Sequence, residues 1–146
     1  MAEWTKRQRE IIDATLEVIS TQGIQYLTIK TLSAKLQVTD GAIYRHFKSK
    51  DEILTFIAEL FKASSTEILD RILASTATNL EKIKAFFLGR CKQFSGDHGL
   101  VLVMFSEDIF KGHQTLQNKI HETIVAHKKL LVEAIVGGQQ EGVIEV

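Results

Sequence analysis

The stretch of sequence that decides the fold spans Thr28–Leu54 and reads TIKTLSAKLQVTDGAIYRHFKSKDEIL. Three of its residues are favoured caps of helix N-termini and stand before runs with helical spacing: Thr28, Thr39 and Ser49. Ile43 and Phe47 lie four residues apart, so they share one face of the second run and can point to a core. The stretch therefore predicts two short helices joined by a tight turn at residues 37–38, followed by the start of a third helix.

An amphipathic helix precedes this stretch. Its apolar stripe contains Ile12, Leu16 and Ile19, which recur at helical spacing. Thr5 and Gln8 have the spacing of a capping box, and Gly23 can end the helix in a left-handed conformation. These signals predict a first amphipathic helix over roughly residues 5–22.

The chain after this stretch also has helical spacing. Ser49 and Glu52 form a second capping-box pattern, and the helix that they open can run without a breaker to Ala74. Three further helices are predicted at about 79–94, 100–110 and 114–136, with glycines between them. The pair Gly137-Gly138 is expected to end the last helix. The apolar run 100–105 could form a strand, but it has no second strand to pair with, so the predicted fold is all-α.

Composition agrees with a helical globular protein. The 146 residues are 45% apolar and 25% charged, and they include no proline. Residues 1–50 hold eight Lys/Arg against five Asp/Glu, whereas residues 51–146 hold ten against thirteen. A basic N-terminal third favours a polyanionic partner for that part of the chain. No apolar run is long enough for a membrane span, no secretory leader is evident, and the single cysteine favours a reducing compartment, so we expect a cytoplasmic protein that lies on the nucleoid when it is bound to DNA.

Three short helices with a tight turn between the second and third fit a helix-turn-helix, whose second helix reads the major groove of DNA. The stretch also resembles the DNA-binding signature of the TetR family of regulators. The residues that carry this resemblance are Gly23, Tyr26, Val38, Gly41, the block YRHF at 44–47, and Lys50 beside an acidic pair. The resemblance implies a helix-turn-helix DNA-binding domain over 1–48. It also implies a helical effector-binding and dimerisation domain over 49–146 that lacks the last helices of the family.

Physical roles follow for the residues of the signature. Groups suited to phosphate contact are Thr28, Lys30, Tyr44, His46 and Lys50, because they offer hydroxyl or cationic donors or lie at helix N-termini. Groups suited to base edges are Thr39, Ala42 and Arg45, of which Arg45 can chelate a guanine. Gly41 lets the backbone approach the duplex closely. Taken singly, Tyr44 can be a packing residue and the lysines can be ordinary surface charges. These roles do not explain why all the signature residues occur together in this order and spacing.

Three residues depart from the family pattern. Gln37 stands where a turn glycine is usual, and a left-handed conformation there costs about 1 kcal/mol. Ser33 replaces an alanine, and we expect its hydroxyl to donate to a carbonyl one turn earlier. Asp40 places a negative charge beside DNA. We expect it to cap a helix, and the alternative is that it accepts from a cytosine amine.

The resemblance implies a pocket for a small apolar effector and a dimer interface in the C-terminal part. The candidate pocket residues are Phe61, Phe86, Phe87, Met104 and Phe105, although a filled core would need the same residue types. Dimerisation is expected because one recognition helix reads too few positions to discriminate among genomic sites. The expected partners are therefore double-stranded DNA with a palindromic operator, a second copy of the chain and an apolar effector.

Catalytic and metal-binding patterns are absent from the sequence. Ser95, Asp97 and His98 supply the residue types of a triad, but they are crowded into one short segment that cannot give triad geometry. The histidines 113, 121 and 127 lack the spacing of a helical metal pair, so we predict no metal, no cofactor and no enzyme activity. The predicted function is a transcriptional repressor that an effector releases from DNA. The alternatives are a chromosome-organising or division-linked factor without an effector, and a helical bundle that has lost DNA reading.

Overall fold

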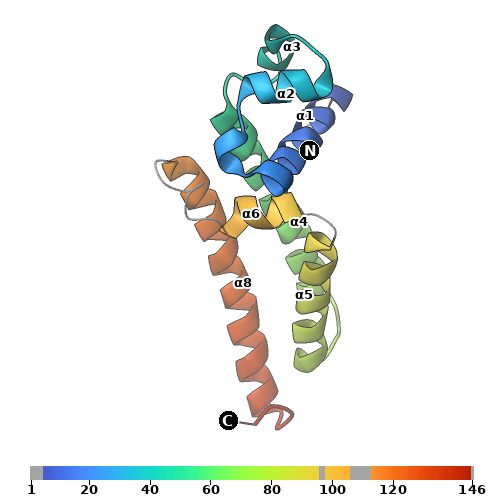
Figure 1. Cartoon of the computed structure of the whole chain (residues 1–146). Coiled ribbons are helices and arrows are strands. Elements are labelled where there is room, and N and C mark those ends of the chain that lie inside the picture. Colours follow the sequence, from blue (N-terminus) through green and yellow to red (C-terminus); the bar gives the residue numbers. More distant parts are fainter. Residues whose placement is uncertain (1–4, 96–97, 106–112, 146) are drawn as a thin grey trace.

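A computed structural model describes residues 5–95, 98–105 and 113–145, and every regular element in them is a helix. The elements in chain order are α1 (Lys6–Gln22), the 3-10 turn η1 (Ile24–Tyr26), α2 (Ile29–Leu36), α3 (Asp40–Tyr44), α4 (Lys50–Leu73), α5 (Asn79–Phe94), α6 (His98–Phe105) and α8 (Gln114–Gln140). Helices α1, α2 and α3 form a head at one end, and α4 leads from it to α5 and α8 (Figure 1). The predicted all-α class, with a long helix that joins two parts, is confirmed.

The predicted caps form at the starts of the helices. Thr5 and Gln8 make a complete capping box, and the hydroxyls of Thr28 and Thr39 accept from backbone amides of α2 and α3. The hydroxyl of Ser49 accepts from the Glu52 amide at 3.1 Å. The Glu52 carboxylate accepts from the amide of Lys48 instead of the Ser49 amide. The second capping box is therefore formed in one direction only.

One continuous core joins the head to the helices that follow it. Leu32, Ile43 and Phe47 are buried in it, as their spacing predicts. The same core includes Ile53, Leu54, Ile57, Ala58 and Phe61 of α4, Val103 and Met104 of α6, and Leu116 and Ile120 of α8. A smaller cluster of Leu69, Ile72, Phe86 and Leu130 lies farther along α4, α5 and α8. Apolar burial thus extends across the predicted boundary at residues 48–49, and α4 shares one core with the head.

Helix α6 packs against α1, and Figure 1 shows it between the head and the long helices. The apolar run 100–105 is helical, as predicted, and α6 starts at His98. A Cβ on Gly99 would lie 2.2 Å from the backbone oxygen of Leu16. Glycine is therefore what permits α6 to approach α1 so closely. The remainder of the predicted helix over 100–110, from residue 106 on, lies outside the described residues.

The end of α8 corrects one prediction. The helix does not stop before Gly137-Gly138 but continues to Gln140. The chain then turns at Gly142, which has a φ of +70°, and the amides of Val143 and Ile144 donate to the carbonyl of Gly138 at 3.0 and 3.1 Å. Ile144 lies against Gly138, where a Cβ would meet it at 2.6 Å. Gly138 therefore leaves room for the returning chain to pack against α8.

Candidate nucleic-acid interface

The turn between α2 and α3 has the predicted geometry. Gln37 adopts φ 54° and ψ 44°, the left-handed conformation, and is the one non-glycine residue with positive φ in the described ranges. Its amide donates to the carbonyl of Ala34 at 3.2 Å, and the Val38 amide donates to that of Ser33 at 2.9 Å. These bonds satisfy carbonyls at the end of α2 and offset the strain of a side chain in this conformation.

A side-chain contact that the sequence did not reveal fixes α3 against α2. The hydroxyl of Ser33 lies 3.0 Å from the Lys30 carbonyl, as predicted, and it also contacts the carboxylate of Asp40. Asp40 is therefore not the cap of α3, which is Thr39. Its carboxylate is held by Ser33, and this explains a negative charge on an otherwise basic face. Residues seven apart across a turn share no helical face, so spacing could not have predicted the contact.

Eight of the nine predicted DNA-contact residues lie in the head and one, Lys50, begins α4; seven of the nine are exposed and two are half-buried. Tyr44 is 53% exposed, and Arg45, which donates from Nε to the Gly41 carbonyl at 3.4 Å, is also exposed. The other exposed members are Thr28, Lys30, Thr39, Gly41 and Lys50, and the half-buried ones are Ala42 and His46. Ile43 and Phe47, four residues apart, are buried. The short α3 thus presents one face to the core and the other to solvent.

Gly41 has no structural need to be glycine. It does not have a positive φ, and a Cβ built on it would meet only the Thr39 hydroxyl, at 3.9 Å. A larger residue would fit the protein, and alanine would favour the helix by about 1 kcal/mol. The open position is compatible with the role predicted from the sequence, which is to let the backbone approach DNA closely.

The lysines near this face differ in their surroundings. Lys35 forms an ion pair with Glu17 of α1 at 2.6 Å, which supports a structural role for it. Lys50 lies in the first turn of α4, where the free amides and the helix dipole attract anions. The next residue, Asp51, lies near His113, with 3.8 Å between Oδ2 of Asp51 and Nδ1 of His113. The residue before α8 thus lies next to the start of α4.

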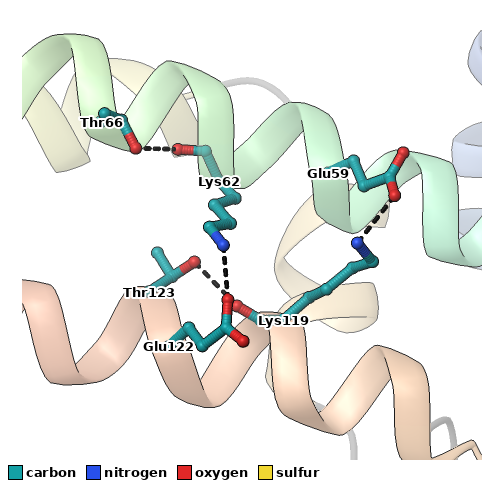
Figure 2. A network of polar contacts seen from close by, with 6 residues as sticks. All are labelled: Glu59, Lys62, Thr66, Lys119, Glu122 and Thr123. Carbon is teal, nitrogen blue, oxygen red and sulfur yellow. Dashed lines mark hydrogen bonds and ion pairs between the residues drawn. The ribbon is translucent and has the colours of Figure 1, made fainter.

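Two ion pairs link α4 to α8, and each helix supplies the lysine of one pair and the glutamate of the other. Lys62 of α4 pairs with Glu122 of α8, and Lys119 of α8 pairs with Glu59 of α4 at 2.7 Å (Figure 2). The hydrogen bond from Lys62 lowers the pKa of the Glu122 carboxyl. Exposed pairs of this kind contribute little each. They mark where α8 lies alongside α4, the helix that leads to the head, and the shared apolar core holds the two helices together.

The predicted pocket residues do not share one environment. Phe61, Phe86 and Met104 are buried, whereas Phe87 and Phe105 are 55% and 62% exposed. A groove of about 750 Å³ lies between α4 and α5, and none of the five is in its lining, which is Ile68, Arg71, Ile72, Ser75, Thr76, Ala77, Glu81, Ala85 and Gly89. The role of these residues as a pocket wall stays a prediction.

Sequence reasoning missed Arg90, a buried cation at the meeting point of three helices. Its Nη1 donates to the Ser65 hydroxyl of α4 at 2.7 Å and lies 3.5 Å from Nε2 of His127 on α8. Its guanidinium carbon lies 5.5 and 5.8 Å from the ring centroids of Phe61 and Phe86. The available signal was its place on the inward stripe of α5, four residues after Phe86.

His127 is neutral in the folded protein. Burial and, second, the charge of Arg90 lower its pKa to about 4 from its ordinary value of 6.5. Because a guanidinium can only donate, Nε2 accepts the contact from Arg90. Between these two pKa values the unfolded chain binds more protons than the folded chain. The contribution of neutral His127 to the unfolding free energy is therefore complete above pH 6.5 and is lost as the pH falls toward 4.

The His127→Gln variant should show this linkage. Between pH 7.5 and 5 we expect the wild type to lose about 1 kcal/mol more unfolding free energy than the variant, after allowance for solvent screening. Urea unfolding at the two pH values measures it. His121→Gln is the control, since His121 is exposed on the same helix, and it should lose as much as the wild type. An equal loss in the His127 variant would contradict the assignment.

Within residues 5–95, 98–105 and 113–145, no group of three or more His, Cys, Asp or Glu side chains is placed to hold a metal ion. None of the helices in those ranges is both long and apolar enough to span a membrane.

Comparison with known proteins gives relatives for the whole chain. The family model for bacterial regulatory proteins of the tetR family matches residues 11–55, which include α2, the turn and α3. The fatty acid metabolism regulator protein of Bacillus subtilis is 28% identical over 99% of this chain and 74% of that protein. The nucleoid occlusion factor SlmA of Photobacterium profundum is 27% identical over 81% of this chain and 61% of the relative.

Solved structures share the fold. The ketosteroid transcriptional regulator KstR2 of Mycobacterium tuberculosis superposes with a TM-score of 0.86 at 21% identity, over 96% of this chain and 71% of that one. The regulator FadR of Bacillus subtilis, solved in complex with stearoyl-CoA, has a TM-score of 0.66 at 28% identity, over 94% of this chain and 74% of that one. The chain thus spans about 61–74% of the lengths of these four relatives.

Proposed function

We propose that this chain, whose residues 11–55 match the tetR family model, is a TetR-type helix-turn-helix regulator that binds DNA sequence-specifically and represses transcription. The observation that carries the proposal is the outer face of α3. Donor side chains lie there beside Gly41, on a helix that its buried face anchors to the core. A face of this kind is what major-groove reading requires.

Within this proposal each residue of the face has a role. Arg45, Thr39 and Ala42 contact base edges, and Gly41 lets the α3 backbone come close to the duplex. The contacts to phosphate are made by Thr28, Lys30, Tyr44, His46 and Lys50. Residues 1–48 act as the reading head, and residues 49–146 act as the effector-binding and dimerisation part.

We propose that a small effector with an apolar body releases the protein from a palindromic operator. Support comes from the Bacillus subtilis relative that was solved with stearoyl-CoA. Helix α4 is the mechanical link, because it begins at Lys50 beside the DNA face and its far half packs with α5 and α8. A ligand that favours one arrangement of α4 and α8 would shift the two heads of a dimer out of register.

A second function has its own support. The nucleoid occlusion factors among the relatives favour a chromosome-organising or division-linked role on the same scaffold. Mapping of chromosomal occupancy separates the two. The proposed repressor should occupy a few sites next to promoters, whereas many dispersed sites away from promoters would favour the organising role and contradict the first proposal.

Gly41→Ala tests whether the DNA face contacts DNA. The substitution should leave unfolding free energy unchanged or raise it by up to about 1 kcal/mol, because helix propensity improves and no atom is displaced. Operator affinity should fall by about tenfold or more, because the added methyl group holds the backbone away from the duplex. Gly89→Ala is the control for a helical glycine on α5, away from the DNA face. Its Cβ would lie 3.1 Å from the Ile68 side chain, which must give slightly, and the variant should bind DNA like the wild type. Undiminished affinity of the Gly41 variant would remove this part of the interface.

A further inference from the structure

Arg90 is a buried cation with one edge of its guanidinium unused. The residue is only 9% exposed, and its Nη1 is engaged by Ser65 and His127. Its Nε and Nη2 are both buried and have no hydrogen-bond partner. Buried donors of this kind are normally satisfied, and an unsatisfied charged group is among the most costly features a core can hold.

No acid of the described chain compensates this charge. Burial is the cause of the lowered pKa of Arg90, and a neighbouring carboxylate would have raised it. The groups that face Arg90 are the Ser65 hydroxyl, the neutral imidazole of His127 and the rings of Phe61 and Phe86. These groups stabilise a cation in part, but none carries a negative charge.

The unused edge has the shape of an anion site. Nε–H and an Nη2–H of a guanidinium point in the same direction, at the separation of the two oxygens of a carboxylate. The surroundings are aromatic, since Phe61 lies close to Arg90 and stacks on Phe94 with 5.5 Å between ring centroids. Nε and Nη2 are closed to solvent, so an anion that binds this edge must enter the core beside these rings, and an apolar body suits that environment.

We infer that Arg90 binds the carboxylate of an amphipathic organic acid through Nε and Nη2, with the apolar part of the acid against Phe61, Phe86 and Phe94. This inference names the chemical class of the effector in the proposed function and rests on that function. It also places the effector where regulation needs it, because Ser65 of α4, Arg90 of α5 and His127 of α8 meet at one guanidinium. An acid bound to Nε and Nη2 of Arg90 would therefore affect the contacts that this side chain makes with α4 and α8.

Thermal unfolding with matched ligands tests this inference. The probes are the sodium salts of octanoic, decanoic, tetradecanoic and 4-phenylbutyric acids, each compared with its methyl ester, which lacks the charge. At ten times its dissociation constant, at least one acid should raise the melting temperature of the wild type by about 3–6 °C. Its ester should raise it much less.

Two arginine variants locate the effect. Arg90→Met should melt at or above the wild-type temperature without ligand, because an unpaired buried charge is removed, and it should lose the shift caused by the acid. Arg71→Met is the matched control, since Arg71 lines the groove between α4 and α5, and it should keep the shift. Arg90→Lys keeps the charge without the fork and should weaken acid binding at least about tenfold.

Three results would overturn the inference: no acid of the series raises the wild-type melting temperature, the ester acts as well as the acid, or the shift survives in both Arg90 variants. A shift that Arg71→Met abolishes while the Arg90 variants keep it would place the ligand in the groove instead. Operator binding without ligand is measured in parallel. If the wild type binds its operator but no acid acts, only this inference fails, whereas loss of specific DNA binding by the wild type refutes the proposed function.

Discussion

Gly99→Ala should lower the unfolding free energy by about 3 kcal/mol. The new Cβ would lie 2.2 Å from the Leu16 oxygen and 2.7 Å from its carbonyl carbon, and both are backbone atoms that no rotamer change can move. Helix α6 would have to shift away from α1, and the apolar contacts of Val103 and Met104 with the core would loosen. Urea unfolding of the variant and the wild type at neutral pH measures the loss.

The matched control is Gly137→Ala, which also places a methyl group on a helical glycine. Its Cβ would meet the amide end of Asn79 at 2.5 Å, and this flexible group can rotate away at the expense of its hydrogen bond to Glu141. Helix propensity offsets that loss, so we expect a change within about 1 kcal/mol. Equal stability of the Gly99 variant and the wild type would mean that α6 does not pack on α1.

Arg45→Ala should lower affinity for the preferred operator by about 10–100-fold and relax the preference at one base position. Arg45 is exposed on α3 and can chelate the O6 and N7 of a guanine, whereas alanine offers no donor. Fluorescence anisotropy with the operator and with duplexes changed at single positions measures both effects.

Two further variants give this experiment its controls. Arg71→Ala removes the same charge far along α4 and should leave both affinity and preference unchanged. Lys30→Ala should weaken binding to all sequences alike and reduce its salt dependence, as loss of a phosphate contact does. An Arg45 variant with the wild-type sequence preference would favour a helical bundle that does not read DNA bases.

Local features of the fold were predictable because their causes are local. Thr28 and Thr39 cap helices through amides three residues away, and the left-handed Gln37 follows from the need to reverse the chain in a short turn. The buried faces of α2 and α3 follow from spacing alone. These features also position the DNA-contact candidates, whose contact with DNA stays a prediction.

The features that the sequence did not reveal depend on distant parts of the chain. Helix α8 continues through Gly137 and Gly138, and the segment after it returns and packs against Gly138. Ser33 finds Asp40 only once the turn has brought α3 beside α2. The burial of Arg90 requires Ser65 and His127 from two other helices, and spacing within α5 shows a stripe but not what faces it.

Selection of binding sites from a random duplex library at about physiological salt tests the central claim most directly, because salt weakens non-specific attraction to phosphate and leaves base contacts to decide. The account predicts enrichment of a palindrome whose half-sites lie about 10 base pairs apart, or a multiple of that, since two copies of α3 must read one face of the duplex. Weak, salt-sensitive binding with no enriched sequence would contradict it.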